Sequence, residues 1–167
     1  AVRSRSEEAP VRAAIVLAAG ASRRFGRADK LFANLRGEPL LLHALRNARS
    51  APARRVIVVA ARAARVRALV RAAGLRAITV VRGGKRGAPL SDTLRAGLAA
   101  LRPIERDAFI FLGDMPGTAP DAPRRLVRAS GGRVGSVRPR HCGSDCASSA
   151  ATPATCGVAM LVPLMLL

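Results

Sequence analysis

The segment RAAIVLAAGASRRFGRADK, residues 12–30, decides how the rest of the chain is interpreted. It begins with a short apolar run that ends at a glycine, which is typical of a β-strand buried on both faces. A turn of small residues follows, and then Arg23, Arg24 and Lys30. Small side chains let backbone N–H groups approach a ligand closely, and those groups attract an anion. The segment therefore predicts an anion-binding turn at the end of a buried strand.

Apolar segments with strand character alternate with helical segments along the chain. The expected strands cover residues 12–20, 54–62, 75–84 and 107–113. The expected helices cover residues 38–49, 62–74, 91–101 and 119–130. Gly74 is expected to end the second helix, and Ser91 to be the N-cap of the third. Such alternation predicts a three-layer α/β/α Rossmann-like fold with a mostly parallel sheet.

The composition limits the classes of protein that fit. The 167 residues suit one domain, and the net charge is +19, almost all of it from arginine spread along the chain. This spread favours a base-composition bias over nucleic-acid binding, so a nucleic-acid partner is not expected. No apolar run reaches the roughly 18 residues of a membrane helix, and residues 1–11 read as a flexible tail without a secretory signal. We therefore expect a cytoplasmic protein without a membrane partner.

The cysteines lie close together near the C-terminus, at Cys142, Cys146 and Cys156. Their odd number excludes a closed set of disulfides. Together with His141 they could be considered as metal ligands, but their spacing matches no zinc pattern with paired cysteines. We do not expect a zinc site there.

Two common nucleotide-binding motifs are excluded by their own spacing rules. The residues after Gly20 do not follow G-x-G-x-x-G, and Lys85 is followed by Arg86 rather than by the Ser or Thr of a P-loop. A second turn is more informative, because Asp114 directly follows the apolar strand segment FIFLG. A carboxylate there is a candidate Mg²⁺ ligand. Ligands of parallel sheets collect at the carboxyl ends of the strands, where Gly20 and Asp114 are both expected.

Four quoted segments carry a family resemblance. They are LAAGASRRFGRADKL (residues 17–31), LRGEPLLLHAL (35–45), SDTLRAGLAAL (91–101) and LGDMPG (112–117). The first two resemble the signature of nucleotidyltransferases with a nucleotide-diphospho-sugar transferase fold. The others narrow the resemblance to molybdenum cofactor cytidylyltransferase-like and guanylyltransferase-like proteins, over residues 12–140, which we expect to form the NTP transferase-like domain.

The resemblance implies a reaction and a set of residues. A phosphate oxygen of molybdopterin would attack the α-phosphorus of a nucleoside triphosphate, with CTP favoured over GTP, and pyrophosphate would leave. The catalytic residues implied are Arg24, Lys30 and Asp114, and Asp114 would also bind Mg²⁺. The nucleotide-binding residues implied are Leu17, Ala18, Ala19, Gly20, Ser22, Arg24 and Lys30. Arg23, in contrast, is read as a solvated basic residue.

The chain departs from the family near Arg140. Family members continue into a Gly-His-Pro turn and a later Gly-Asp segment, and residues 141–167 contain neither. The composition changes at the same place, so our hypothesis is a reading-frame shift that makes residues 141–167 an irregular, out-of-frame tail. We then expect an incomplete sheet and an impaired enzyme.

Two alternatives stay open at this point. The first is a nucleotidyltransferase with another acceptor, such as a sugar phosphate or a polyol phosphate. The second is a basic α/β protein that binds a nucleotide or nucleic acid without turnover.

Overall fold

The computed structural model describes residues 11–20, 29–130, 135–136 and 159–163. The strands of its main sheet are β1 (Val11–Ala18), β4 (Arg55–Ala60), β5 (Ile78–Arg82), β6 (Glu105–Leu112), β7 (Gly135–Ser136) and β8 (Ala159–Pro163). A separate small hairpin is formed by β2 (Asn34–Leu35) and β3 (Glu38–Pro39). The spatial order in the main sheet is β5-β4-β1-β6-β8-β7.

The main sheet is mostly parallel. Strand β1 lies between β4 and β6 and is parallel to both, and β4 is parallel to β5. Strand β8 is antiparallel to β6 and to β7. The consecutive parallel strands are joined by helical crossovers, as parallel pairing requires.

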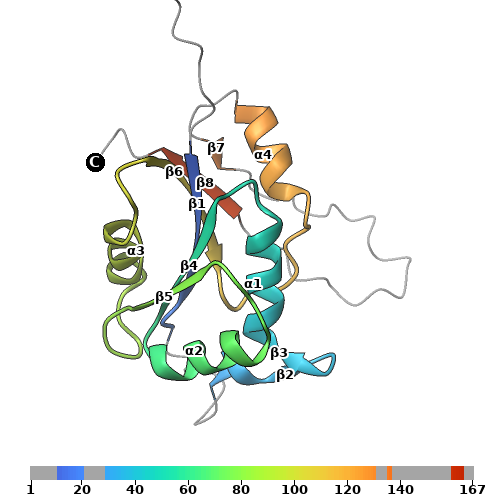
Figure 1. The fold of residues 1–167 in the computed structure, drawn as a ribbon, viewed down its shortest axis with the longest axis vertical. Coiled ribbons are helices and arrows are strands. Elements are labelled where there is room, and N and C mark those ends of the chain that lie inside the picture. Colours follow the sequence, from blue (N-terminus) through green and yellow to red (C-terminus); the bar gives the residue numbers. More distant parts are fainter. Residues whose placement is uncertain (1–10, 21–28, 131–134, 137–158, 164–167) are drawn as a thin grey trace, which may run out of the picture.

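The helices are α1 (Leu40–Ser50), α2 (Ala63–Ala72), α3 (Leu90–Ala99) and α4 (Ala122–Ser130), with a short 3₁₀ helix, η2 (Lys30–Phe32). Helix α3 lies on one side of the sheet, and α1 and α4 lie on the other (Figure 1). Side chains of α2 join the same core cluster as those of α1. The three-layer α/β/α architecture expected from the sequence is therefore confirmed.

Strand β1 shows why the central strands are apolar on both faces. Ile15 and Leu17 belong to the core cluster that packs against α3, while Ala14 and Val16 belong to the cluster under α1, α2 and α4. Successive side chains of a strand point to opposite faces, and both faces are covered by helices here. The uninterrupted apolar run of the sequence follows from this double burial.

The ends of two helices test the expected end signals. Gly74 has a φ of 63°, a left-handed conformation that ends α2 as expected. The expected N-cap at Ser91 is wrong, because α3 begins at Leu90 and its N-cap is Pro89. The carbonyl of Pro89 accepts hydrogen bonds from the backbone N–H groups of Asp92 and Thr93, at 3.1 and 3.3 Å. Ser91 therefore lies in the first turn, where it is exposed.

Strand β8 differs from the irregular tail expected at residues 141–167. Residues 159–163 pair with β6 from Asp107–Pro163 to Phe111–Ala159. The backbone of β6 needs hydrogen-bond partners on the side away from β1, and the backbone of residues 159–163 supplies them. Outside the described part of the chain lie the remaining tail residues, the junction at Arg140, the three cysteines, His141 and the N-terminal residues 1–10.

Within the described part, no helix has the length and apolarity needed to cross a bilayer.

Candidate functional site

The carboxyl ends of β1 and β6 lie side by side at the carboxyl-terminal end of the sheet, which is called the sheet edge below. Leu17 is the register partner of Leu112, and the backbone N–H of Gly113 donates a 2.9 Å hydrogen bond to the carbonyl of Leu17. Gly20 follows β1 and Asp114 follows β6. These two expected site residues therefore leave the sheet from the same edge, next to each other in strand order.

The turn after β1 can offer its backbone to a ligand. The side chains of Leu17, Ala18 and Ala19 are buried in the core, whereas Gly20 is exposed. A Cβ atom placed on Gly20 would meet no atom within 4 Å, so the space beside it is open. Residues 17–20 would thus contact a ligand through their main-chain groups.

Lys30 and Asp114 are brought together although 84 residues separate them. The Nζ atom of Lys30 lies 3.4 Å from Oδ2 of Asp114, and the two side chains are 38% and 48% exposed. An ion pair this exposed contributes little stability, because water screens it and ordering both side chains costs entropy. Both groups can therefore exchange partners when a charged ligand enters.

Asp29 positions Lys30 and is a residue that the sequence reasoning missed. Its Oδ1 atom accepts a hydrogen bond from the backbone N–H of Leu31 at 3.3 Å, which caps η2. Leu31 is buried in the core and fixes the short helix to the sheet. An Asp immediately before a helical turn is a recognisable N-cap signal, but a turn of three residues is too short to stand out in a sequence.

The turn that carries Asp114 is held by helix α1. The side-chain amide of Asn47 donates to the carbonyl of Pro116 at 2.6 Å, and the hydroxyl of Ser50 donates to the carbonyl of Pro120 at 3.0 Å. Both donors lie on the polar side of an amphipathic helix. Nothing in the sequence distinguishes them from solvated residues, since their partners are 69 and 70 residues away.

The loop after β5 is hydrogen-bonded to the residues that follow β4 and β1. After β5, the backbone N–H of Gly83 donates to the carbonyl of Ala60 at 3.1 Å, and that of Gly87 donates to the carbonyl of Ala19 at 3.2 Å. The second bond joins this loop directly to the turn after β1. The edge thus combines a main-chain turn, a cation, a carboxylate and an anchored loop.

The first turn also contains two further expected site residues, Ser22 and Arg24, and the arginine between them. Ser22, Arg23 and Arg24 lie outside the described part of the chain. Their proposed roles consequently rest on the sequence alone.

Asp114 is the described residue that could bind a divalent metal at this edge. The described residues contain no group of three or more His, Cys, Asp or Glu side chains that could hold a metal ion by themselves. Asp114 supplies one half-exposed carboxylate. Mg²⁺ typically takes one or two carboxylates together with water and substrate phosphates, so Asp114 suits a metal that binds along with a phosphate ligand.

Together, the fold and the edge define the chain as a protein with the Rossmann-like nucleotidyltransferase fold. More particularly, the chain belongs to the MobA-like NTP transferase domain family, whose model matches residues 14–155. The family resemblance inferred from the sequence is thereby confirmed. None of the curated protein sequences matches the chain significantly.

Solved structures resemble the chain over much of its length. Rv0371c from Mycobacterium tuberculosis H37Rv is 31% identical with a TM-score of 0.59, over 75% of this chain and 62% of that protein. A manganese complex of Rv0371C is 29% identical with a TM-score of 0.58, over 73% and 60% of the two chains. The chain therefore spans about three-fifths of the length of these relatives. A 4-diphosphocytidyl-2C-methyl-D-erythritol synthase is 15% identical with a TM-score of 0.63, over 95% of this chain and 77% of that protein. The two proteins share the fold.

Proposed function

We propose that this chain binds a nucleoside triphosphate and acts as a nucleotidyltransferase, moving a nucleoside monophosphate to a phosphate acceptor and releasing pyrophosphate. The observation that carries the proposal is the meeting of Gly20, Lys30 and Asp114 at one sheet edge, 3.4 Å separating the charged pair. Membership of the NTP transferase family supports it. The acceptor that we propose is of the molybdopterin type, on the strength of the sequence resemblance.

The step would be an in-line displacement at phosphorus. An acceptor phosphate oxygen attacks the α-phosphorus and forms the new P–O bond. The bond between the α-phosphorus and the bridging oxygen breaks, and its electron pair leaves with pyrophosphate. The protein's tasks are then to position the reactants and to stabilise charge, without a covalent intermediate on the enzyme.

The expected site residues divide the tasks of that step. The backbone from Leu17 to Gly20 would hold the nucleotide, because its side chains are buried or absent. Lys30 would turn from Asp114 to the phosphates and neutralise the charge of the leaving pyrophosphate. Arg24 would share this task, whereas Arg23 would stay in solvent.

A divalent metal, which we take to be Mg²⁺, would be held by Asp114. The manganese complex of the relative Rv0371C supports a divalent metal in this family. When bound, such an ion supplies charge neutralisation at the phosphate oxygens. The exchange of partners is chemically consistent, since the carboxylate released by Lys30 becomes available as a ligand.

The base and the acceptor that we propose follow from the sequence resemblance. The form of the first motif favours CTP over GTP. A sugar phosphate or polyol phosphate is the alternative acceptor, and proteins that share the fold include a 4-diphosphocytidyl-2C-methyl-D-erythritol synthase. The chemistry at the α-phosphorus would be the same in each case.

The test is pyrophosphate release by the purified chain with CTP or GTP, Mg²⁺ and molybdopterin, or with 2-C-methylerythritol 4-phosphate in place of molybdopterin. We expect release with CTP and molybdopterin, and a loss of at least about a hundredfold in Asp114→Asn, because a metal-centred charge is worth several kcal/mol. Asp121→Asn is the matched control, since Asp121 is exposed and pairs only loosely with Arg125, at 3.9 Å. Normal turnover in Asp114→Asn would exclude that residue from the site.

Binding without turnover is the second candidate function, favoured by the net charge of +19. It predicts no pyrophosphate release with any acceptor. It also predicts binding of random-sequence DNA that weakens steeply with salt. The two functions are therefore distinguished by the same protein preparation.

A further inference from the structure

A second basic region lies at the carboxyl ends of β4 and β5, beside the proposed nucleotide site. A hollow of about 420 Å³ opens there, within the size range of small-molecule sites. It is lined by Ala61, Arg62, Ala63, Ala64, Arg65, Arg67 and Arg82. Every charged group in this lining is a guanidinium. We call this region the arginine hollow.

Two of its arginines are only partly engaged by the protein. Nη1 of Arg62 lies 3.9 Å from Oδ2 of Asp29, a long and weak ion pair. Arg65 lies over the ring of Phe32, 3.9 Å from its centre. That stacking satisfies the face of the guanidinium and leaves its N–H donors at the rim without a carboxylate partner in the described part of the chain.

The side chains of the other two arginines are also weakly engaged. Arg67 donates one long hydrogen bond, 3.4 Å, to the carbonyl of Val80. Among the described residues, the side chain of Arg82 has no ion-pair or hydrogen-bond partner, although its backbone pairs with β4. The four arginines are exposed and close together, and among the described residues only Arg62 has a carboxylate within ion-pair distance. Their charges therefore repel one another, and an anion in the hollow would relieve that repulsion.

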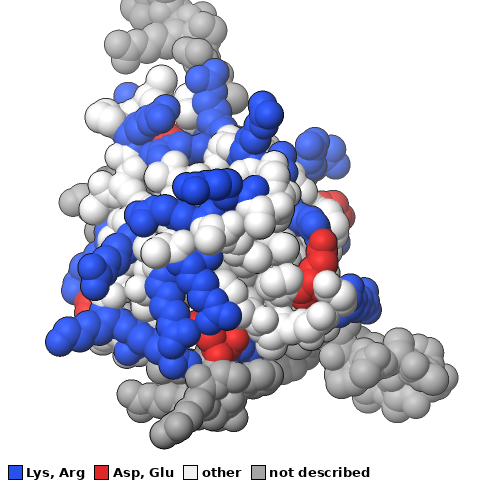
Figure 2. Space-filling view, turned by 60° about the horizontal axis from the view of Figure 1, so that its bottom comes forward, with Lys and Arg blue, Asp and Glu red and all other residues white. Residues whose placement is uncertain are grey.

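The start of α2 adds to the attraction for an anion. Arg62 is its N-cap and makes no side-chain capping bond, and the first turn contains no acidic residue. The N-terminal N–H groups of α2 thus keep their partial positive charge at the wall of the hollow. Figure 2 shows the same excess over the face that carries α2, where Lys and Arg side chains far outnumber acidic ones.

We propose that the arginine hollow binds a small anion that carries a diphosphate group. The forked donors of arginine match phosphate oxygens in pairs, and two adjacent phosphates can engage arginines from both α2 and β5. A single strand of nucleic acid fits less well, because such binding uses open aromatic rings for stacking and Phe32 is covered by Arg65. This inference does not depend on the proposed transferase activity.

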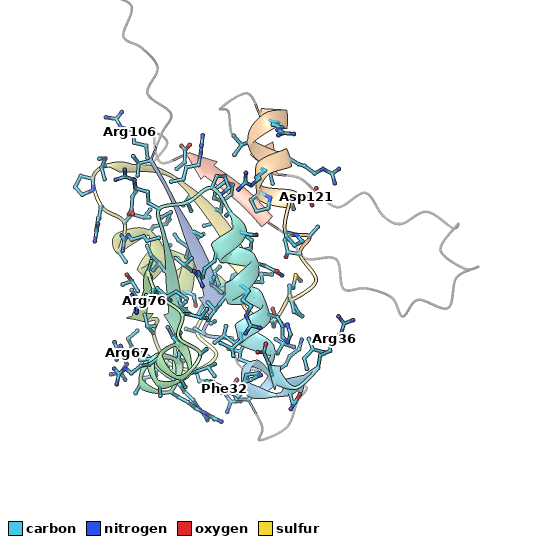
Figure 3. All side chains as sticks on the ribbon, turned by 45° about the vertical axis from the view of Figure 1, so that its right-hand side comes forward. Phe32, Arg36, Arg67, Arg76, Arg106 and Asp121 are labelled. Atoms are coloured by element: carbon cyan, nitrogen blue, oxygen red, sulfur yellow. The ribbon has the colours of Figure 1, made fainter. Side chains whose placement is uncertain are left out.

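The experiment is a calorimetric titration with inorganic pyrophosphate at constant ionic strength. The test variant is Arg65→Gln combined with Arg82→Gln, and we expect its affinity to fall by at least about tenfold, since each charged hydrogen bond to phosphate is strong. The matched control is Arg106→Gln. Arg106 is an exposed arginine near the amino end of β6, at the opposite end of the molecule from Arg67 in Figure 3. The control should bind as tightly as the unaltered chain.

Three outcomes would overturn the proposal. One is the absence of pyrophosphate binding, and another is an equal loss in the double variant and the control, which would mean unspecific attraction by the net charge. The third is a loss in Lys30→Ala with none in the double variant, which would place the anion at the turn after β1. Titrating the unaltered chain and the double variant with cytidine diphosphate identifies the source of the diphosphate group. Binding tighter than that of pyrophosphate which is lost in the double variant points to a nucleotide in the hollow.

Discussion

At the scale of single residues, two glycines near the sheet edge have opposite surroundings. A Cβ on Gly113 would lie 3.1 Å from the carbonyl oxygen of Leu17 and 3.2 Å from Cβ of Ala18, so a side chain there would be tightly packed against the turn after β1. A Cβ on Gly20 would meet nothing within 4 Å. If Gly20 is needed, the reason is a ligand and not the packing of the protein.

Replacing each glycine by valine separates these two requirements. We expect Gly20→Val to keep the unfolding free energy and to weaken CTP binding by about tenfold or more, because the new side chain occupies space that main-chain contacts need. Gly113→Val should instead destabilise the fold by about 1–3 kcal/mol through overpacking. Urea unfolding and CTP titration of both variants measure the two effects. Undiminished CTP binding by Gly20→Val would remove this turn from the nucleotide site.

At the scale of elements, a clamp joins β4 and β6 across the amino ends of the strands, away from the proposed site. Nε and Nη2 of Arg55 donate to the two carboxylate oxygens of Glu105 at 2.6 and 2.7 Å, and the side chains are 12% and 2% exposed. The backbone N–H of Arg102 adds a 2.7 Å bond to Glu105. Hydrogen bonding by Arg55 lowers the pKa of Glu105 and raises that of Arg55.

The clamp predicts a pH-dependent contribution to stability. Because the pKa of Glu105 is lowered in the folded state, the contribution is fully present above the unfolded-state pKa of about 4.3 and is lost as the pH falls through the folded value. We expect Glu105→Gln to cost about 3 kcal/mol at pH 7, since it leaves Arg55 without its counter-charge. Urea unfolding of the variant and the unaltered chain from pH 7 down to pH 3 should show this difference shrinking.

The control for that experiment is an exposed pair. Arg46 and Glu38 also make paired hydrogen bonds, and Arg46 lowers the pKa of Glu38, but their side chains are 47% and 37% exposed. Glu38→Gln should therefore change stability little at any pH. If Glu38→Gln and Glu105→Gln proved equally costly, burial would not be what gives the clamp its strength.

At the scale of the whole molecule, the charge balance opposes folding. The 29 basic residues face only 10 acidic ones, and most arginines of the described part are exposed. Packing cationic side chains onto one compact surface raises their mutual repulsion. The apolar core on both faces of the sheet must offset this cost.

Raising the ionic strength should accordingly stabilise the chain. Sodium chloride shortens the screening length from about 30 Å at 0.01 M to about 8 Å at 0.15 M, which weakens the repulsion. We expect the urea midpoint at pH 7 to rise over this range. A falling midpoint would mean that attractive ion pairs, and not repulsion, dominate the electrostatic free energy. Pyrophosphate at matched ionic strength should raise the midpoint further if the arginine hollow binds it.

Much of the architecture could be predicted because it follows from local patterns. The apolar runs around Ile15, Ile57 and Ile110 became central strands, and Leu41 and Leu45 became the buried side of α1, because burial on both sheet faces leaves a continuous apolar signal. Capping was predicted less well. Pro89 replaced Ser91 as the N-cap, since a backbone carbonyl can begin a helix without a side-chain bond.

The sequence by itself determined the alternation of strands and helices, the family, and the two turns that contain Gly20 and Asp114, because these depend on neighbours along the chain. Only the tertiary structure decided which distant groups meet: Lys30 with Asp114, Asn47 with the carbonyl of Pro116, and the arginines of α2 with Arg82. Strand order and crossover geometry set these contacts, and no local pattern encodes them. The strand formed by residues 159–163 is of the same kind, since its pairing with β6 depends on a partner about fifty residues away along the chain.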